Sequence, residues 1–186
     1  MVRESFTLQG GVGFANAVRR ALTTETKMWA PIEVVFETNT SAHTDEYLAH
    51  RIGMIPFRRT GPETELRVAA HGPCTVLAKD LRASAAGGFE AIHGSIEVAR
   101  LGARQSLRST VRFKEGAAKR HARFCPCAAV TMSDDGDAHA ISFETIDESD
   151  HGTRLKEAID AIDAMCDDAL LQIAKQPTTP PTSFRA

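Results

Sequence analysis

Residues 153–175 have the sequence TRLKEAIDAIDAMCDDALLQIAK, and this stretch is the most informative about the fold. Its apolar residues recur at steps of three and four, which predicts an amphipathic helix with a narrow apolar seam about six turns long. The seam consists of Leu155, Ile159, Ile162, Cys166, Ala169 or Leu170, and Ile173. Such a seam is usually part of a core, but its length and narrowness also favour packing against a second chain.

A second apolar stripe lies near the N-terminus. Phe14, Val18 and Leu22 follow each other at steps of four, which predicts a helix over residues 12–26. This helix comes after a turn marked by glycines at positions 10, 11 and 13, and it ends before Pro31. Arg19 and Arg20 are turned away from the stripe at 100° per residue.

The remaining sequence is dominated by short strand patterns. The expected strands are 4–9, 32–38, 66–70, 75–78, 96–101, 107–113, 127–132 and 140–146, with a turn over 133–138. A short helix capped by Thr44 or Asp45 ends at Gly53, and 117–123 suit a helical turn.

The pattern predicts an α+β fold in which a discontinuous domain of strands and two helices is interrupted by a β-rich insertion. The expected ranges are 1–58 for the first half of that domain, 59–135 for the insertion, 136–176 for the second half, and 177–186 for a proline-rich, disordered tail.

The composition is that of a soluble globular protein. The chain has 186 residues, of which 42% are hydrophobic and 25% charged, and this composition excludes global disorder. The formal net charge is −2, which argues weakly against a free-standing nucleic-acid binder. The charge is uneven: residues 61–133 carry 11 basic and 6 acidic side chains, whereas 134–186 carry 4 and 12. No membrane span or signal peptide is expected, so the four cysteines are expected to be thiols or metal ligands in a reducing compartment.

Two groups of residues invite a chemical interpretation. His121, Cys125 and Cys127 suit zinc, and His71 with Cys74 could complete a ligand set, but the C-x-C spacing favours buried thiols on one face of a strand. Asp45, Glu46 and His50 could form an acid–base group, but a structural pair on one helix face is the commoner outcome. We therefore expect no metal, no cofactor and no catalytic residue.

Four segments together resemble one known family. They are FANAVRRAL at 14–22, ETNTS at 37–41 with DEYLAHRIGMIP at 45–56, GPCTV at 72–76 with KDL at 79–81, and GAAKRHARF at 116–124. They are similar, in the same order, to segments of the α-like subunits of multisubunit DNA-directed RNA polymerases. They match the archaeal form and the eukaryotic third-largest subunit better than the bacterial form.

The resemblance implies a function without catalysis. Family members dimerise with a second α-like chain, and the dimer is the platform on which the largest and second-largest catalytic subunits assemble. The implied dimer interface consists of Phe14, Val18, Leu22, Leu155, Ile159, Ile162, Cys166 and Ile173. The implied docking residues for the large subunits are Arg19, Arg20, Glu46 and Arg51.

The resemblance leaves several alternatives open. The partner is expected to be a smaller α-like chain, with a bacterial-type homodimer or a stand-alone regulator as the other interpretations. No direct sequence-specific DNA contact and no membrane partner are expected. The compact form suits the polymerase of a large DNA virus, and the expected location is intracellular: nucleus, cytoplasm or, for a virus, virion or viral factory.

Overall fold

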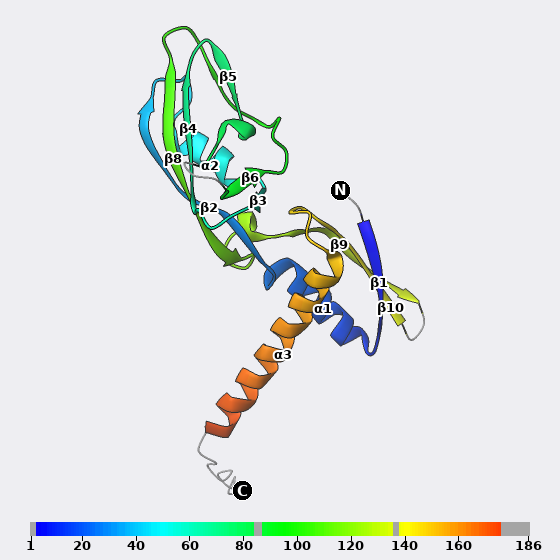
Figure 1. The fold of residues 1–186 in the computed structure, drawn as a ribbon. Helices are drawn as coiled ribbons and strands as arrows, with labels where there is room; N and C mark the ends of the chain where they lie inside the picture. Colours follow the sequence, from blue (N-terminus) through cyan, green and yellow to red (C-terminus); the bar gives the residue numbers. More distant parts are fainter. Residues whose placement is uncertain (1–2, 84–86, 136–137, 176–186) are drawn as a thin grey trace, which may run out of the picture.

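The computed structural model describes residues 3–83, 87–135 and 138–175, so the expected disordered tail at 177–186 lies outside the described residues. These ranges contain three α-helices, two short 3₁₀ turns and ten strands in an α+β arrangement (Figure 1), which confirms the predicted fold class. The helices are α1 (Val12–Thr24), α2 (Asp45–Gly53) and α3 (His151–Lys175).

The first core lies where α1 and α3 pack against a three-stranded sheet. The sheet has the order β1–β10–β9, with β1 (Arg3–Gln9), β9 (Cys127–Asp135) and β10 (Ala138–Thr145), and both pairings are antiparallel. Ile141 and Phe143 of β10 are fully buried beside Val18 and Leu22 of α1. Gly10 turns the chain from β1 into α1 with a backbone φ of +135°, a conformation that residues other than glycine rarely adopt.

The second core contains most of the remaining strands. Its main sheet has the order β2–β8–β4, with β2 (Lys27–Asn39), β4 (Glu65–His71) and β8 (Ser106–Ala117). Two strand pairs complete it, β3 (Phe57–Arg59) with β6 (Phe89–Ala91), and β5 (Cys74–Leu77) with β7 (Glu97–Leu101). The 3₁₀ turns are η1 (Ala78–Asp80) and η2 (Ala122–Phe124).

Strand β2 and helix α1 differ from the expected ranges. The helix ends at Thr24, because the chain enters β2 at Lys27 and the Thr26 hydroxyl bonds to the Leu22 carbonyl at 2.8 Å. Pro31 lies inside β2, and the register against β8 shifts between Pro31 and Glu33 because proline has no N–H to donate. Strands β3 and β6 were not expected from the sequence, since three-residue strands are too short to show alternation.

The two cores divide the chain at different residues from the expected domain ranges. Helix α2 was assigned to the 1–58 half, but its buried Leu48 and Ile52 belong to the second core. Strand β9 was assigned to the 59–135 insertion, but it pairs with β10 and contributes Cys127 to the first core. In both cases the side chains are buried by residues that are distant in the sequence, and local sequence patterns do not show which core they join.

The burial of α1 also changes the role expected for two interface residues. Val18 and Leu22 are fully buried within the chain against β10 and α3, whereas Phe14 is 44% exposed. Of the predicted α1 stripe, therefore, only the first residue reaches the surface.

We predict that Leu22→Ala lowers the stability of the chain itself. Removing a fully buried leucine side chain costs about 2–5 kcal/mol of unfolding free energy. Phe14→Ala on the same helix is the control and should cost less than about 1 kcal/mol, because surface positions contribute little. Chemical denaturation followed by circular dichroism measures both. Equal losses would show that the two positions are buried alike.

Candidate protein-interaction site

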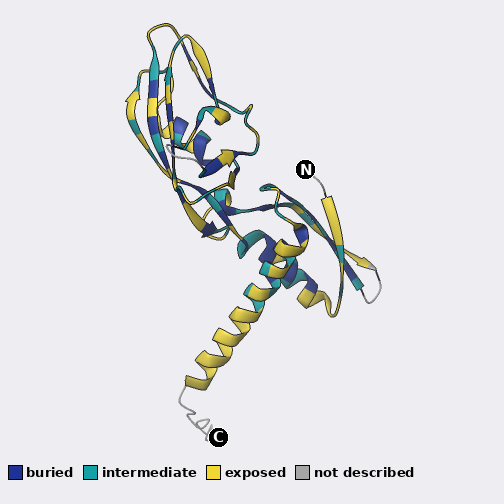
Figure 2. Cartoon of the chain, in the orientation of Figure 1, coloured by how far each residue is buried: buried dark blue, intermediate teal, exposed yellow. Residues whose placement is uncertain are grey.

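Helix α3 projects away from the body of the molecule for half of its length (Figures 1 and 2). Leu155, Ile159 and Ile162 are partly buried and pack against the first core, and Ala158 is fully buried. Every residue from Asp163 to Lys175 is exposed. The predicted seam therefore has two parts, an N-terminal part that packs within the chain and a C-terminal part that nothing in the described residues covers.

The uncovered part contains large apolar side chains. Met165 is 49% exposed, Leu170 64%, Leu171 58% and Ile173 66%. Cys166, also predicted for the interface, is exposed between them. At 100° per residue Leu170 and Ile173 lie on the seam with Cys166, whereas Met165 and Leu171 point to other sides of the helix. Exposed apolar side chains on one helix face are typical of a surface that is buried in a complex.

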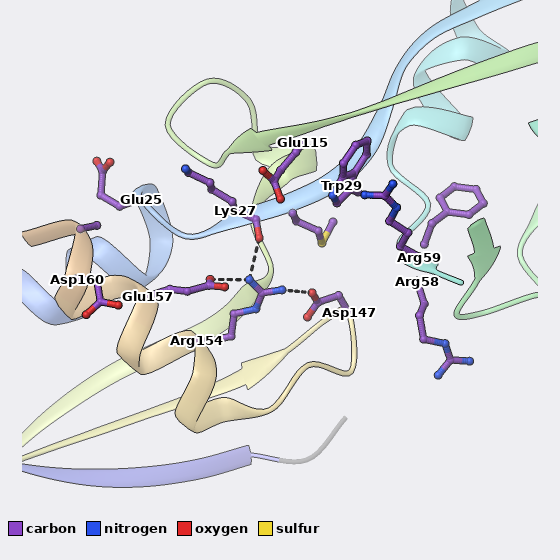
Figure 3. Close-up of a pocket in the computed structure, with 13 residues that line it drawn as sticks. Glu25, Lys27, Trp29, Arg58, Arg59, Glu115, Asp147, Arg154, Glu157 and Asp160 are labelled. Atoms are coloured by element: carbon purple, nitrogen blue, oxygen red, sulfur yellow. Dashed lines mark hydrogen bonds and ion pairs between the residues drawn. The ribbon is translucent and has the colours of Figure 1, made fainter. Parts of the chain in front are cut away.

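A buried arginine fixes the base of α3. The Arg154 guanidinium donates to the Lys27 carbonyl at 2.8 Å, to Glu157 at 2.6 Å and to Asp147 (Figure 3). Its Nε also donates to the Ser149 hydroxyl at 2.7 Å. Burial alone would lower the pKa of Arg154, but Asp147 and Glu157 outweigh it and raise that pKa. Arg154 thus joins α3 to the start of β2 and to the segment after β10, a role that no pattern in the sequence predicted.

A cleft of about 610 Å³ opens beside Arg154, between the two cores (Figure 3). Met28, Trp29 and Phe57 supply its apolar lining, and the Arg59 guanidinium lies 4.2 Å from the centre of the Trp29 ring. Asp160 and Ala161 of α3 form part of the same lining, so the cleft adjoins the root of the uncovered helix.

The predicted docking residues lie in two places. Arg20 is exposed on α1, while Arg19 next to it is partly buried and its Nε donates to Asn16 at 3.0 Å. Glu46 is exposed on α2. Arg51 instead uses its guanidinium within the chain, where it donates to the Glu97 carbonyl of β7 and to the Tyr47 hydroxyl at 3.2 Å. Its position makes Arg51 a link between α2 and β7 rather than a free surface group.

The candidate metal residues are not brought together, and Asp45 of the acid–base candidate is hydrogen-bonded to a residue outside its helix. Cys127 is in the first core, where burial is the main cause that raises the pKa of its thiol to about 12. His71 and Cys74 are exposed at the turn between β4 and β5, which belong to the second core. His121 Nδ1 accepts from the Arg123 backbone N–H at 3.1 Å, and Asp45 accepts from Asn39 at 2.7 Å. In the part of the chain that the structure describes, no three His, Cys, Asp or Glu side chains are grouped to hold a metal, and no helix is long and apolar enough to cross a membrane.

Comparison with known proteins identifies the family. The sequence is 30% identical over 173 residues to DNA-directed RNA polymerase subunit Rpo3 of Methanocaldococcus jannaschii, covering 90% of this chain and 88% of that protein. The chain belongs to the Rpo3 family. The resemblance to α-like polymerase subunits is thereby confirmed. No family model matches the sequence.

Two further Rpo3 proteins match a shorter part of the chain. Rpo3 of Pyrococcus horikoshii is 33% identical over 135 residues, and Rpo3 of Thermococcus kodakarensis is 34% identical over 127 residues. These alignments cover 66% and 62% of this chain but 52% and 49% of the two relatives. The chain therefore matches about half the length of these longer Rpo3 proteins.

We predict that Arg154→Met weakens the fold of this Rpo3-family chain at the root of α3. The change leaves the nearly buried Asp147 carboxylate without its cation, which costs about 3 kcal/mol of unfolding free energy. Lys156→Met is the matched control, because Lys156 pairs with Asp160 only at the exposed surface, and its stability should not change measurably. Thermal and urea unfolding compare the two, and similar midpoints would contradict the role given to Arg154.

Proposed function

We propose that this chain is a non-catalytic assembly subunit of a DNA-directed RNA polymerase that dimerises with a second, smaller α-like subunit through α3. The membership in the Rpo3 family supports a place in the polymerase. The observation that carries the dimer is the uncovered half of α3, where Leu170 and Ile173 of the seam are 64% and 66% exposed.

The length of the uncovered helix argues that a partner is needed. Residues 163–175 extend for about 20 Å at 1.5 Å per residue. Helical segments of this length are marginal in water unless an amphipathic face is packed. A helix from a second chain seated along Leu170 and Ile173 would bury that face and continue the packing that Ile159 and Ile162 begin inside the chain.

The exposed start of α1 fits the same interface. Val12 is 55% exposed and Phe14 44%, and α1 packs beside α3 in the first core. Two helices from each partner would then form a four-helix contact. The side chains of Val18 and Leu22 would support this contact from within the core rather than touch the partner.

A structural role also suits the charged groups of the cleft. Arg154 pairs with Asp147 and Glu157, Asp160 pairs with Lys156, and Glu25 pairs with Lys119 at 2.6 Å. The pairs of Arg154 and Glu25 hold elements of the chain together, whereas Asp160 and Lys156 pair within α3. We assign the docking of the second-largest catalytic subunit to the α1 surface at Arg19 and Arg20, together with Glu46 on α2.

We predict that Leu170→Asp combined with Ile173→Asp abolishes co-purification of the smaller α-like subunit. Two carboxylates placed in an apolar interface would have to be desolvated without a partner cation, which is strongly unfavourable. These positions test the interface better than Ile159 and Ile162, which also pack within the chain. Affinity purification with mass spectrometry measures the partner.

The control for this experiment is Ala164→Asp, an exposed position on the side of α3 opposite the seam. It should leave co-purification intact. A double variant that retains its partner would show that the uncovered seam is not the interface. A wild-type chain that elutes as a homodimer, or that is captured without any large polymerase subunit, would instead support the bacterial-type or stand-alone alternative.

We predict that Arg19→Ala combined with Arg20→Ala weakens recruitment of the second-largest subunit and spares the α-like dimer. The planar guanidinium can bind carboxylates or carbonyls in pairs, which suits a contact between subunits. Reconstitution followed by size-exclusion chromatography measures the two steps separately. Normal assembly, or loss of the dimer itself, would show that these arginines have another role.

A further inference from the structure

Strand β4 lies at an edge of the main sheet of the second core, and part of its free side is unpaired. Its other side pairs with β8 along its whole length. On the free side, Arg67 exchanges two backbone hydrogen bonds with Arg82, at 2.7 and 2.9 Å. Successive residues of an antiparallel strand direct their N–H and C=O groups to opposite sides, so Ala69 directs its groups to the same side as Arg67. Among the described residues, no backbone group pairs with Ala69 on that side.

A cleft of about 620 Å³ adjoins this unpaired stretch. Its lining includes Ala69 and His71 of β4 and Thr75 and Val76 of β5, and the two strands belong to different sheets. Both strands lie at the end of the molecule opposite to the projecting half of α3 (Figure 1). Ala69 is exposed and its side chain is a single methyl group, so another backbone can approach the edge at this position.

Two arginines that face each other border the same cleft. Arg67 and Arg82 are directly opposite in their backbone bridge, so their side chains lie on one face, where like charges destabilise a sheet. Both are exposed, and the only described carboxylate paired with either is Glu65, which reaches Arg67 at 4.0 Å. Asp80, also in the lining, already accepts from the Leu77 N–H at 2.8 Å. The cleft therefore has an excess of positive charge.

We infer that the free edge of β4 binds an extended acidic segment of another protein, which adds a short strand at Ala69 and places a carboxylate against Arg67 and Arg82. An unpaired strand edge is a template for such an addition, in which main-chain hydrogen bonds supply affinity and side chains supply preference. This site is separate from α3, and the inference does not depend on dimerisation through that helix.

The register of β4 places the carboxylate. Paired residues of two strands share a face, and residues two positions apart on one strand also share a face. The residue that pairs with Ala69 would therefore have its side chain on the face of Arg67, as a diagonal neighbour. A glutamate at that position would lie next to both arginines. A nucleic acid would also neutralise the arginines, but it has no N–H and C=O groups at strand spacing to satisfy Ala69.

The experiment measures binding of a short labelled peptide of alternating glutamate and valine to the full-length chain by fluorescence anisotropy. Ala69→Pro should weaken binding about fivefold, because it removes one hydrogen-bond donor from the edge. This proline should not disturb the sheet, since the Ala69 N–H does not pair with β8. The Ala69 N–H of the wild-type chain should also become protected from hydrogen exchange, measured by NMR, when the peptide binds.

The charge is tested separately. Arg67→Glu combined with Arg82→Glu should weaken binding about tenfold at low salt, because two attractions become repulsions. Lys114→Glu combined with Arg120→Glu is the matched control. It makes the same change of net charge at exposed residues that line a different cleft, and it should stay within about twofold of wild type. Circular dichroism confirms that each variant is folded.

Several outcomes would overturn the inference. They are no peptide binding at about 1 mM, no protection of the Ala69 N–H, and equal effects of the two charge-reversed variants. Equal binding of the same peptide with N-methylated backbone amides would show that no strand is added, and this comparison holds even if Ala69→Pro does not fold. Binding of oligothymidylate in place of the acidic peptide would show a phosphate site and would also contradict the inference.

Discussion

The contact made by Arg154 is the constraint on which the shape of the molecule depends. One guanidinium joins the first turn of α3 to the start of β2 and to the segment after β10. Because Lys27 begins the strand that runs into the second core, the same contact ties the direction of α3 to both cores. Removing such a cation from the nearly buried Asp147 carboxylate is costly, so this geometry is held firmly.

Arg154 fixes the N-terminal end of α3, and the C-terminal half of the helix extends beyond the rest of the molecule. The seam that packs on the first core through Ile159 and Ile162 continues without a break into the exposed Leu170 and Ile173. One helix thus both packs within the chain and presents an uncovered apolar face beyond it. The Rpo3 relative is named as a subunit of DNA-directed RNA polymerase, and an uncovered apolar helix face fits a protein of that kind.

Much of the fold and of this surface could be predicted from the sequence. Periods of three and four over 155–173 and of four over 14–22 identify the two helices, and both are local signals that do not depend on the rest of the chain. The cap at Thr44 is equally local, since its side chain accepts from the Tyr47 N–H. The four family segments carried the assignment to α-like polymerase subunits.

The tertiary structure decided which apolar side chains of these helices are buried and which remain exposed at the surface. The sequence alone determined that Val18, Leu22, Leu170 and Ile173 lie on apolar helix faces, but those faces look alike in the sequence. Val18 and Leu22 are buried because β10 and α3 fold over them, and Leu170 and Ile173 are exposed because the body ends before the helix does. The ion pair of Arg154 with Asp147 and the hydrogen bond from Arg51 to the backbone carbonyl of Glu97 were decided in the same way, because both depend on residues that only the folded chain brings together.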